Sequence, residues 1–264
     1  MKHILSLLRD PLLNGLDVDE NRRMELHRIM LQRKPMLQIA FAEFHQLFKT
    51  LNHQFLSGTG MEIELGAGIA PMKNSYADVL ATDVVASPQS DRVLDAEAMD
   101  IADHSIRTIY GQNCFHHFPH PDRFFTELTR VLTPGGGAIL LEPYYGPVAA
   151  FMYKRLFTTE GFDKNYRSWD TPVTGPMNGA NQALSYIVFV RDRAEFIRKY
   201  PTLDIVYQAP VGNYLKYLLS GGLNFRQLAP SSFINGIGWI EKMLSPFNRW
   251  IALHHVTVLR KASH

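Results

Sequence analysis

Carboxylates and glycines recur in the first half of the chain where short apolar runs end. The run "MEIEL" carries Glu64 and is followed by Gly66 and Gly68, and a second run ends at Asp83. Glycines let a ligand lie against bare backbone, and a carboxylate accepts hydrogen bonds from hydroxyl pairs such as those of a ribose. The pattern favours a nucleotide-type ligand, although a tight turn between a strand and a helix explains the two glycines alone equally well.

A parallel sheet would bring these residues together. Apolar runs over 61–65, 78–85, 105–113 and 136–143 predict strands, and 120–136 predicts a helix that ends at Pro134-Gly135. Strands that alternate with helices indicate an α/β fold with a doubly wound, mostly parallel sheet. Since ligands bind at the carboxyl ends of such strands, we expect Glu64, Asp83 and Asn113 at one edge.

The flanking segments predict further helices and strands of a single domain over 1–264. Residues 18–56 have helical periodicity, with Asp17 or Asp19 as the cap and a break at Pro35. The runs 203–210 and 250–261 predict strands, and 213–246 predicts two small apolar helices. We divide the domain into N-terminal helices (1–58), a cofactor-binding core (60–143), a substrate-side insertion forming a lid (144–185) and a C-terminal part of the sheet (186–264).

Composition excludes several classes of protein. The net charge of +2 over 264 residues argues against a nucleic-acid partner, and the single cysteine, Cys114, excludes an internal disulfide. No uncharged apolar run approaches the roughly 18 to 20 residues that cross a bilayer, and no signal-peptide pattern opens the chain. We therefore expect a soluble, cytoplasmic protein.

The ordered set of motifs resembles the class I S-adenosylmethionine-dependent methyltransferases, most closely the methyltransferase type 11 group, over about residues 60–143. "ELGAGIA" is similar to the family's E/D-x-G-x-G-x-G loop, and "ATDVVAS" to its ribose strand. "VLDAEAMDIADHSIRTIY" is similar to its adenine loop and fourth strand, and "NCFHHFPHPDRFFTELTRVLTPGGGAILLEP" to the segment that leads into the fifth strand. The resemblance implies a seven-stranded Rossmann-like sheet and S-adenosylmethionine as cofactor.

The resemblance also implies which residues hold the cofactor. Asp83 would hold the ribose, Val84 would lie against the adenine ring, and Glu64 would orient the loop and the cofactor's ammonium group. The full implied set is Glu64, Gly66, Ala67, Gly68, Asp83, Val84, Asp95, Ala96, Gln112 and Asn113. The sequence departs from the family at the third glycine, which is Ala70 followed by Pro71, and in 71–79, which is short and a poor helix.

Two adjacent histidines are the candidate catalytic residues. His116 or His117 could act as a general base for a hydroxyl acceptor, although a histidine pair is also common filler at this place in the family. Tyr144 and Tyr145 are expected to line the substrate mouth, near Glu142. We expect no metal, because carboxylates at ligand spacing are missing around the histidines. His254 and His255, in the terminal strand, are expected to be structural.

The acceptor is constrained only by what the sequence lacks. Family members that methylate base or amide amines carry Asn or Asp, then Pro-Pro-Tyr or Phe, after the fourth strand, whereas this chain has "NCFH". A small-molecule or glycan-type acceptor, methylated at oxygen, is favoured. A nucleotide-cofactor-dependent oxidoreductase on a related fold and a non-catalytic S-adenosylmethionine-binding protein remain alternatives.

Two apolar segments have open roles. The aromatic residues of 144–169 would line a pocket or lid, or form the core of an added subdomain. Segment 232–252 is apolar on one face, and we favour packing on the domain over contact with a membrane surface or a dimer contact. The oligomeric state is left open.

Overall fold

The computed structural model describes residues 8–13, 15, 21–69, 71–158, 160–173, 175 and 179–263. Its strands form one seven-stranded sheet in the order β3-β2-β1-β4-β5-β7-β6, in which β7 runs in the direction opposite to the other six strands. This arrangement confirms the predicted fold class. The strands are β1 (Met61–Leu65), β2 (Val79–Asp83), β3 (Arg92–Val93), β4 (Ile106–Gln112), β5 (Leu132–Pro143), β6 (Leu203–Val211) and β7 (His254–Lys261).

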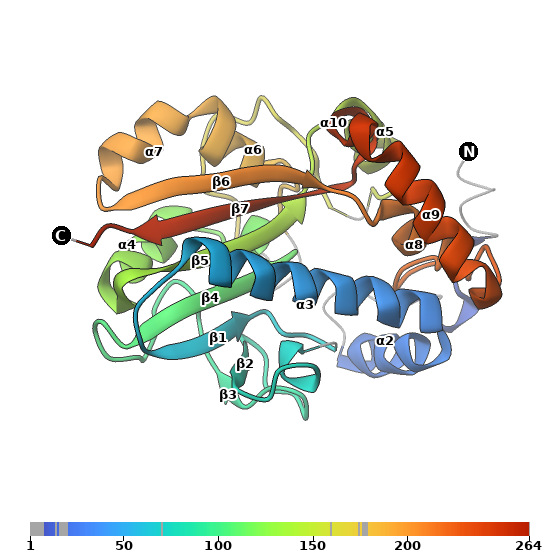
Figure 1. Cartoon of the computed structure of the whole chain (residues 1–264), viewed down its shortest axis with the longest axis horizontal. Coiled ribbons are helices and arrows are strands. Elements are labelled where there is room, and N and C mark those ends of the chain that lie inside the picture. Colours follow the sequence, from blue (N-terminus) through green and yellow to red (C-terminus); the bar gives the residue numbers. More distant parts are fainter. Residues whose placement is uncertain are drawn as a thin grey trace.

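One long helix covers one face of the sheet. The N-terminal helical region breaks at Pro35 as predicted, into α2 (Asn21–Arg33) and α3 (Pro35–Phe55), because proline suits the first turn of a new helix. The predicted start near 18, with its caps Asp17 and Asp19, lies outside the described residues. Phe44 and Phe48 of α3 pack in one buried cluster with Tyr110 of β4, and α3 runs across the front of the sheet (Figure 1).

The helix expected after β1 is nearly absent. Among the described residues between β1 and β2, the 3-10 turn η2 (Met72–Asn74) is the only helical element, in agreement with the predicted truncation. Met72 is fully buried in the cluster that α3 forms on the sheet. The N-terminal helix therefore supplies apolar cover on the face where this turn lies.

The opposite face carries an aromatic core. It is covered by α4 (Pro121–Val131), α6 (Leu184–Tyr186), the π-helical η4 (Ile187–Arg191) and α7 (Arg193–Lys199). Phe115, Phe125, Phe189 and Phe196 are fully buried there, and Phe125 lies with its ring centroid 5.0 Å from that of Phe196. Because α4 follows β4, this core fixes the loop that carries the adjacent histidines.

A third layer of short helices lies beyond the carboxyl-terminal ends of β5 and β6. It contains α5 (Pro147–Arg155), α8 (Tyr214–Leu219), η5 (Ser231–Phe233), α9 (Ile234–Leu244), η6 (Ser245–Phe247) and α10 (Asn248–Ile251). The first element of the chain is the 3-10 turn η1 (Pro11–Leu13). In α9, Ile237 and Glu241 are buried, whereas Trp239 and Met243 are exposed. None of the described helices is long and apolar enough to span a membrane.

Candidate active site

The carboxylates predicted from sequence meet at one edge of the sheet. Glu64 and Asp83 stand at the ends of the paired strands β1 and β2, and the backbone N–H of Leu94 donates to the carbonyl of Asp83. Asp95 therefore follows directly beside the end of β2. Glu64, Asp83 and Glu142 all add to the rise in the pKa of the Cys114 thiol, which is caused first by its burial.

The glycine loop has a backbone conformation that residues with a Cβ atom rarely adopt. Gly66 has φ +61° and Gly68 has φ +52°, both in the left-handed region. A Cβ on Gly66 would lie 2.8 Å from the Cβ of Cys114, whereas a Cβ on Gly68 would meet nothing closer than 3.8 Å. The intervening Ala67 is buried and donates its N–H to the carbonyl of Thr82. Ala70, at the third glycine position, lies outside the described residues.

No cationic side chain of the described residues forms an ion pair with Glu64. Its Oε2 accepts the backbone N–H of Met72 at 2.6 Å, and only 2% of the residue is exposed. Burial raises the pKa of Glu64 to about 8, against the Met72 hydrogen bond, and the charge of Asp83 raises it further. The carboxyl group is therefore largely protonated at neutral pH, until a cation approaches it.

The carboxylate of Asp83 accepts hydrogen bonds from the loop and can accept further ones from a ligand. Its Oδ2 accepts the N–H of Gly68 at 3.0 Å, and its Oδ1 accepts that of Val85 at 3.1 Å. Each carboxylate oxygen accepts about two hydrogen bonds, so both oxygens retain a free lone pair. The adjacent Val84 is 54% exposed, which leaves an apolar side chain beside the carboxylate for a ring to cover.

The predicted adenine loop is partly closed on itself. Asp95 is exposed, and its Oδ1 accepts the N–H of Glu97 at 2.8 Å, while Ala96 is buried. Burial raises the pKa of Glu97, which accepts the backbone N–H of His120.

Two half-buried side chains at the end of β4 have buried oxygen atoms that lack a hydrogen-bond donor among the described residues. Gln112 Oε1 and Asn113 Oδ1 have no hydrogen-bond partner among the described residues. Asn113 has φ +51°, a strained conformation for a residue other than glycine. Buried acceptors without donors cost free energy, and a ligand with N–H or O–H groups would satisfy them. Together with the glycine loop and the exposed Val84, they fit a nucleoside cofactor with a polar tail.

A cluster of histidines and carboxylates follows β4, where the candidate catalytic residues were predicted. His116 is buried, and its Nδ1 lies 2.5 Å from Glu142 Oε2 while its Nε2 lies 3.1 Å from Glu160 Oε2. His117 Nε2 lies 4.0 Å from Glu160 Oε1. Glu142 also accepts the N–H groups of Cys114 and Phe115, which fixes the 3-10 turn η3 (Phe115–His117).

The two carboxylates decide the protonation of His116. Burial alone would lower its pKa, but the charges and hydrogen bonds of Glu142 and Glu160 outweigh burial and raise it to about 10. The same contact lowers the pKa of Glu160 to about 2, against the effect of its own burial. In this arrangement His116 is protonated at neutral pH and holds no lone pair for a proton from an acceptor.

Sequence reasoning missed Glu160, whose position in an irregular segment gave no motif signal. It found Glu142 only as a neighbour of the substrate mouth. His254 and His255 are buried as expected, and burial lowers their pKa values to about 4 and about 3, respectively.

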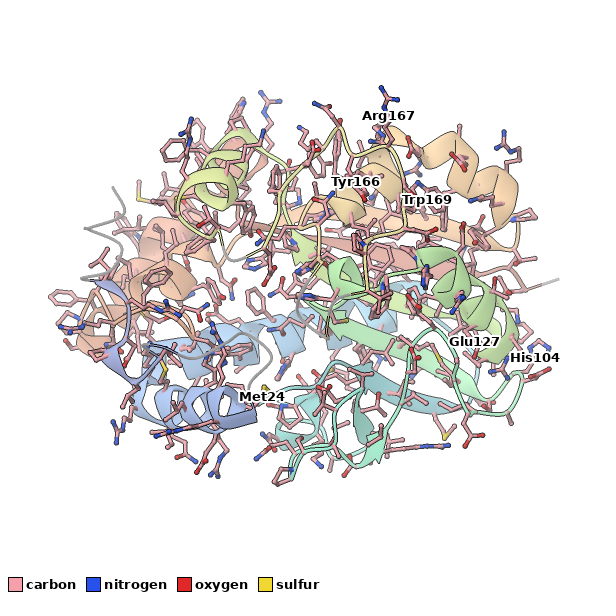
Figure 2. The ribbon with its side chains drawn as sticks, turned by 180° about the vertical axis from the view of Figure 1, so that it is seen from behind. Met24, His104, Glu127, Tyr166, Arg167 and Trp169 are labelled. Atoms are coloured by element: carbon pink, nitrogen blue, oxygen red, sulfur yellow. The ribbon has the colours of Figure 1, made fainter. Side chains whose placement is uncertain are left out.

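Tyr144 and Tyr145 lie between β7, which carries His254 and His255, and the layer of short helices. Their ring centroids are 4.5 Å apart, and that of Tyr145 lies 5.4 Å from that of His255. The other aromatic residues of this stretch do not form one wall: Tyr153 is buried with Phe162, and Trp169 belongs to the core under α4. Figure 2 shows Tyr166 and Trp169 on one loop, from which Arg167 points outward.

Comparison with known proteins agrees with this geometry. Residues 63–140 match the family described as "Methyltransferase domain". Over these residues the chain contains a methyltransferase domain. The resemblance to the S-adenosylmethionine-dependent methyltransferases, and with it the expected cofactor, is confirmed. No curated protein matches the sequence significantly.

Solved structures with a similar fold are distant in sequence. One is the phosphoethanolamine N-methyltransferase 2 of Haemonchus contortus in complex with S-adenosyl-L-methionine, 12% identical, with a TM-score of 0.49; the match covers 96% of this chain and 59% of that one. Another is the geranyl diphosphate C-methyltransferase of Streptomyces coelicolor A3(2), 10% identical over 82% of this chain and 78% of that one, with a TM-score of 0.49. This chain thus spans less than two thirds of the length of the first structure, and the substrate named for either structure is not assigned to this chain.

Proposed function

We propose that the chain transfers a methyl group from S-adenosylmethionine to a small-molecule or glycan-type acceptor, at oxygen. The observation that carries the cofactor half is the convergence of Glu64, Asp83 and the unsatisfied Gln112 and Asn113 oxygens around the Gly66–Gly68 loop. The bound cofactor supplies a methyl group that its sulfonium charge has already activated.

The protein's own work is alignment and exclusion of water. Asp83 receives ribose hydroxyls on the oxygen lone pairs that the loop leaves free, and Val84 covers the adenine ring. The buried carboxyl group of Glu64 and the acceptors of Gln112 and Asn113 orient the polar tail. In-line displacement gains most of its rate from such positioning, so no fixed catalytic motif is needed.

The acceptor half is supported by the residues beyond β4. The histidine-carboxylate cluster provides groups that handle protons, which an oxygen acceptor needs and a tertiary amine does not. The small net charge and the "NCFH" sequence after β4 argue against nucleic acid. Because His116 is tied to two carboxylates, His117 is the better candidate for direct contact with the acceptor.

Calorimetry with the cofactor and with its demethylated product tests the first half of this proposal. Asp83→Asn keeps the shape of the side chain but removes the charge, and we expect it to weaken binding by about 1.5–3 kcal/mol, the range for hydrogen bonds to a charged group. Asp100→Asn is the matched control, since Asp100 is exposed and pairs with Arg92 away from the loop. Equal affinity of wild type and Asp83→Asn would contradict the placement of the ribose.

Methyl transfer from radiolabelled cofactor into fractionated small molecules and glycans tests the second half. Base-labile label would indicate a methyl ester, base-stable label that hydriodic acid releases as methyl iodide would indicate a methyl ether, and label that resists both treatments would contradict oxygen as the acceptor atom. Binding of the cofactor with no incorporation into any fraction would favour the non-catalytic alternative, and binding of a nicotinamide cofactor instead would favour the oxidoreductase.

A further inference from the structure

The cluster after β4 brings together three side chains of the kinds that bind transition metals. His116, His117 and Glu160 each offer one ligand atom, and these three atoms lie within 4.8 Å of one another. His116 and His117 are neighbours on η3, with ring centroids 4.2 Å apart, and Glu160 reaches them from the segment after α5. Ligands around a small cation stand about 3 to 3.5 Å apart, so modest side-chain rotation closes the set.

The position of His116 favours a ligand role for one particular nitrogen. Its Nδ1 is hydrogen-bonded to Glu142 Oε2 and its Nε2 to Glu160 Oε2, so a metal ion would replace the proton on Nε2, which binding would release to the solvent. Histidines that bind metals usually donate their other ring N–H to a carboxylate, which fixes the ring and strengthens the ligand. Glu142 is itself fixed by the backbone N–H groups of Cys114 and Phe115. The chain therefore contains both the ligands and the support that such a site requires.

We propose that His116, His117 and Glu160 bind a divalent first-row transition-metal ion such as Zn²⁺, with one or more coordination positions left open. Two imidazoles and one carboxylate suit Zn²⁺ and its neighbours, whereas Mg²⁺ and Ca²⁺ prefer oxygen ligands. The sequence predicted no metal because it showed no carboxylate at ligand spacing; the fold supplies Glu160 from 43 positions after His117.

The place of the site gives the ion a use. Glu142 joins the cluster to Cys114, whose side chain lies against Gly66 of the cofactor loop. An ion with open positions would bind a hydroxyl or carboxylate of the acceptor and favour its deprotonated form. This second role rests on the proposed function, whereas binding of the ion does not.

Calorimetric titration of the chelator-treated full chain with Zn²⁺ tests the site. The visible absorption spectrum of bound Co²⁺ is a second measurement, which reports the coordination geometry of the ion. We expect one equivalent to bind, and Glu160→Gln and His117→Ala each to weaken binding at least tenfold. His120→Ala is the matched control, because His120 lies on the same loop but pairs with Asp170. It should bind as the wild type does.

Cofactor affinity, measured on the same samples, separates failure of this site from failure of the fold or of the proposed function. Variants that keep cofactor binding and lose the ion support the site. No binding by the wild type, or equal affinity in Glu160→Gln, His117→Ala and His120→Ala, overturns the proposal whether or not the cofactor binds.

A second feature, the outer face of the helical layer, carries an independent inference. Seven large apolar side chains are exposed there, and Trp239, Met243 and Phe247 recur at helical spacing on one side. The set is Leu228, Phe233, Trp239, Ile240, Met243, Phe247 and Trp250, which we call the α9 face. Packing on the domain, the role favoured from sequence, accounts for the inner side of α9 but not for this one; α9 lies on the outside of the molecule (Figure 1).

Within residues 224–252 the exposed charges are of one sign. Arg226, Lys242 and Arg249 are exposed, whereas Glu241, which is the only carboxylate of residues 224–252, is buried and paired with Lys216 at 2.6 Å. Tryptophan and phenylalanine flanked by basic side chains suit the boundary between lipid headgroups and acyl chains. From the aromatic content and the charge we infer that the α9 face docks on an anionic membrane surface.

Co-sedimentation with vesicles tests this docking. We expect binding to vesicles that contain phosphatidylglycerol, weaker binding to pure phosphatidylcholine, and loss of binding in a Trp239→Ser, Met243→Ser variant. Ile197→Ser, which removes an exposed apolar side chain of α7, is the control and should bind normally. No sedimentation of the wild type, or a concentration-dependent dimer that the double variant abolishes, would overturn the inference.

Discussion

The protonation of Glu64 links cofactor binding to pH. Because burial raises its pKa to about 8, the free protein carries a largely neutral carboxyl group at pH 7. A cationic ammonium or sulfonium group nearby favours the carboxylate and lowers that pKa, so binding should release a proton. We expect cofactor titrations at pH 7 in buffers of different ionisation enthalpy to report a net release of up to one proton.

Glu64→Gln is the variant that assigns this proton, since the amide keeps an acceptor for the Met72 N–H but cannot ionise. Its release should fall close to zero at pH 7, and the wild-type release should fade as pH rises above 8. Undiminished release in Glu64→Gln would assign the proton to another group, such as Glu97.

At this scale the sequence located the carboxylates and glycines that the fold brings to one edge of the sheet, but not the side-chain contacts beyond β4. Glu64, Gly66 and Asp83 are tied to strand ends, and a strand end has a local signature that a reader of the sequence can find. Glu160 reaches His116 from an irregular segment between α5 and α6, and no local sequence pattern predicts a contact between residues 44 positions apart. The protonation of His116 depends on that contact, so it was equally hidden.

At the scale of elements, α3 is fastened to the sheet by a polar network as well as by apolar packing. The hydroxyl of Tyr110 accepts from Asn52 Nδ2 at 2.5 Å and donates to Glu62 Oε2 at 2.7 Å. Lys49 and Arg107 form ion pairs with the same Glu62. Glu62 of β1 thus links β1 to both α3 and β4.

Tyr110→Phe should therefore destabilise the protein even though Phe fills the same space. We expect the free energy of unfolding to fall by about 1–2 kcal/mol. The buried Asn52 Nδ2 loses the Tyr110 hydroxyl as an acceptor, whereas Glu62 keeps its other partners. Urea unfolding followed by circular dichroism measures the change. Tyr76→Phe is the matched control, because the Tyr76 hydroxyl bonds to Gln46 at an exposed position. Equal losses in the two variants would show that burial of the Tyr110 network contributes nothing.

The elements themselves were largely readable from the sequence. Periodicity and proline predicted α2, α3 and α4, and short apolar runs predicted β1, β2, β4, β5, β6 and β7, the last of them rich in β-branched residues. The two-residue β3 has too few side chains to produce a pattern and followed only from the resemblance. The exposure of the α9 face could not be read, because an amphipathic helix looks the same whether or not its outer side is covered.

At the scale of the whole molecule, cofactor binding should stabilise the entire fold. The residues of the site come from β1, β2, the loop after β3 and the end of β4, so the unfolded chain cannot present them together. A ligand that binds only the folded chain adds RT ln(1 + [L]/Kd), about 2.7 kcal/mol at a hundred times Kd. We expect the urea midpoint to rise with the logarithm of S-adenosylmethionine concentration, with the slope set by the Kd from calorimetry. Asp83→Asn should show the same dependence displaced to higher concentration, because it weakens the site without removing it. A midpoint that stays constant while calorimetry records binding would mean that the cofactor binds the unfolded chain as well, and the convergence of strand ends would then no longer explain its affinity.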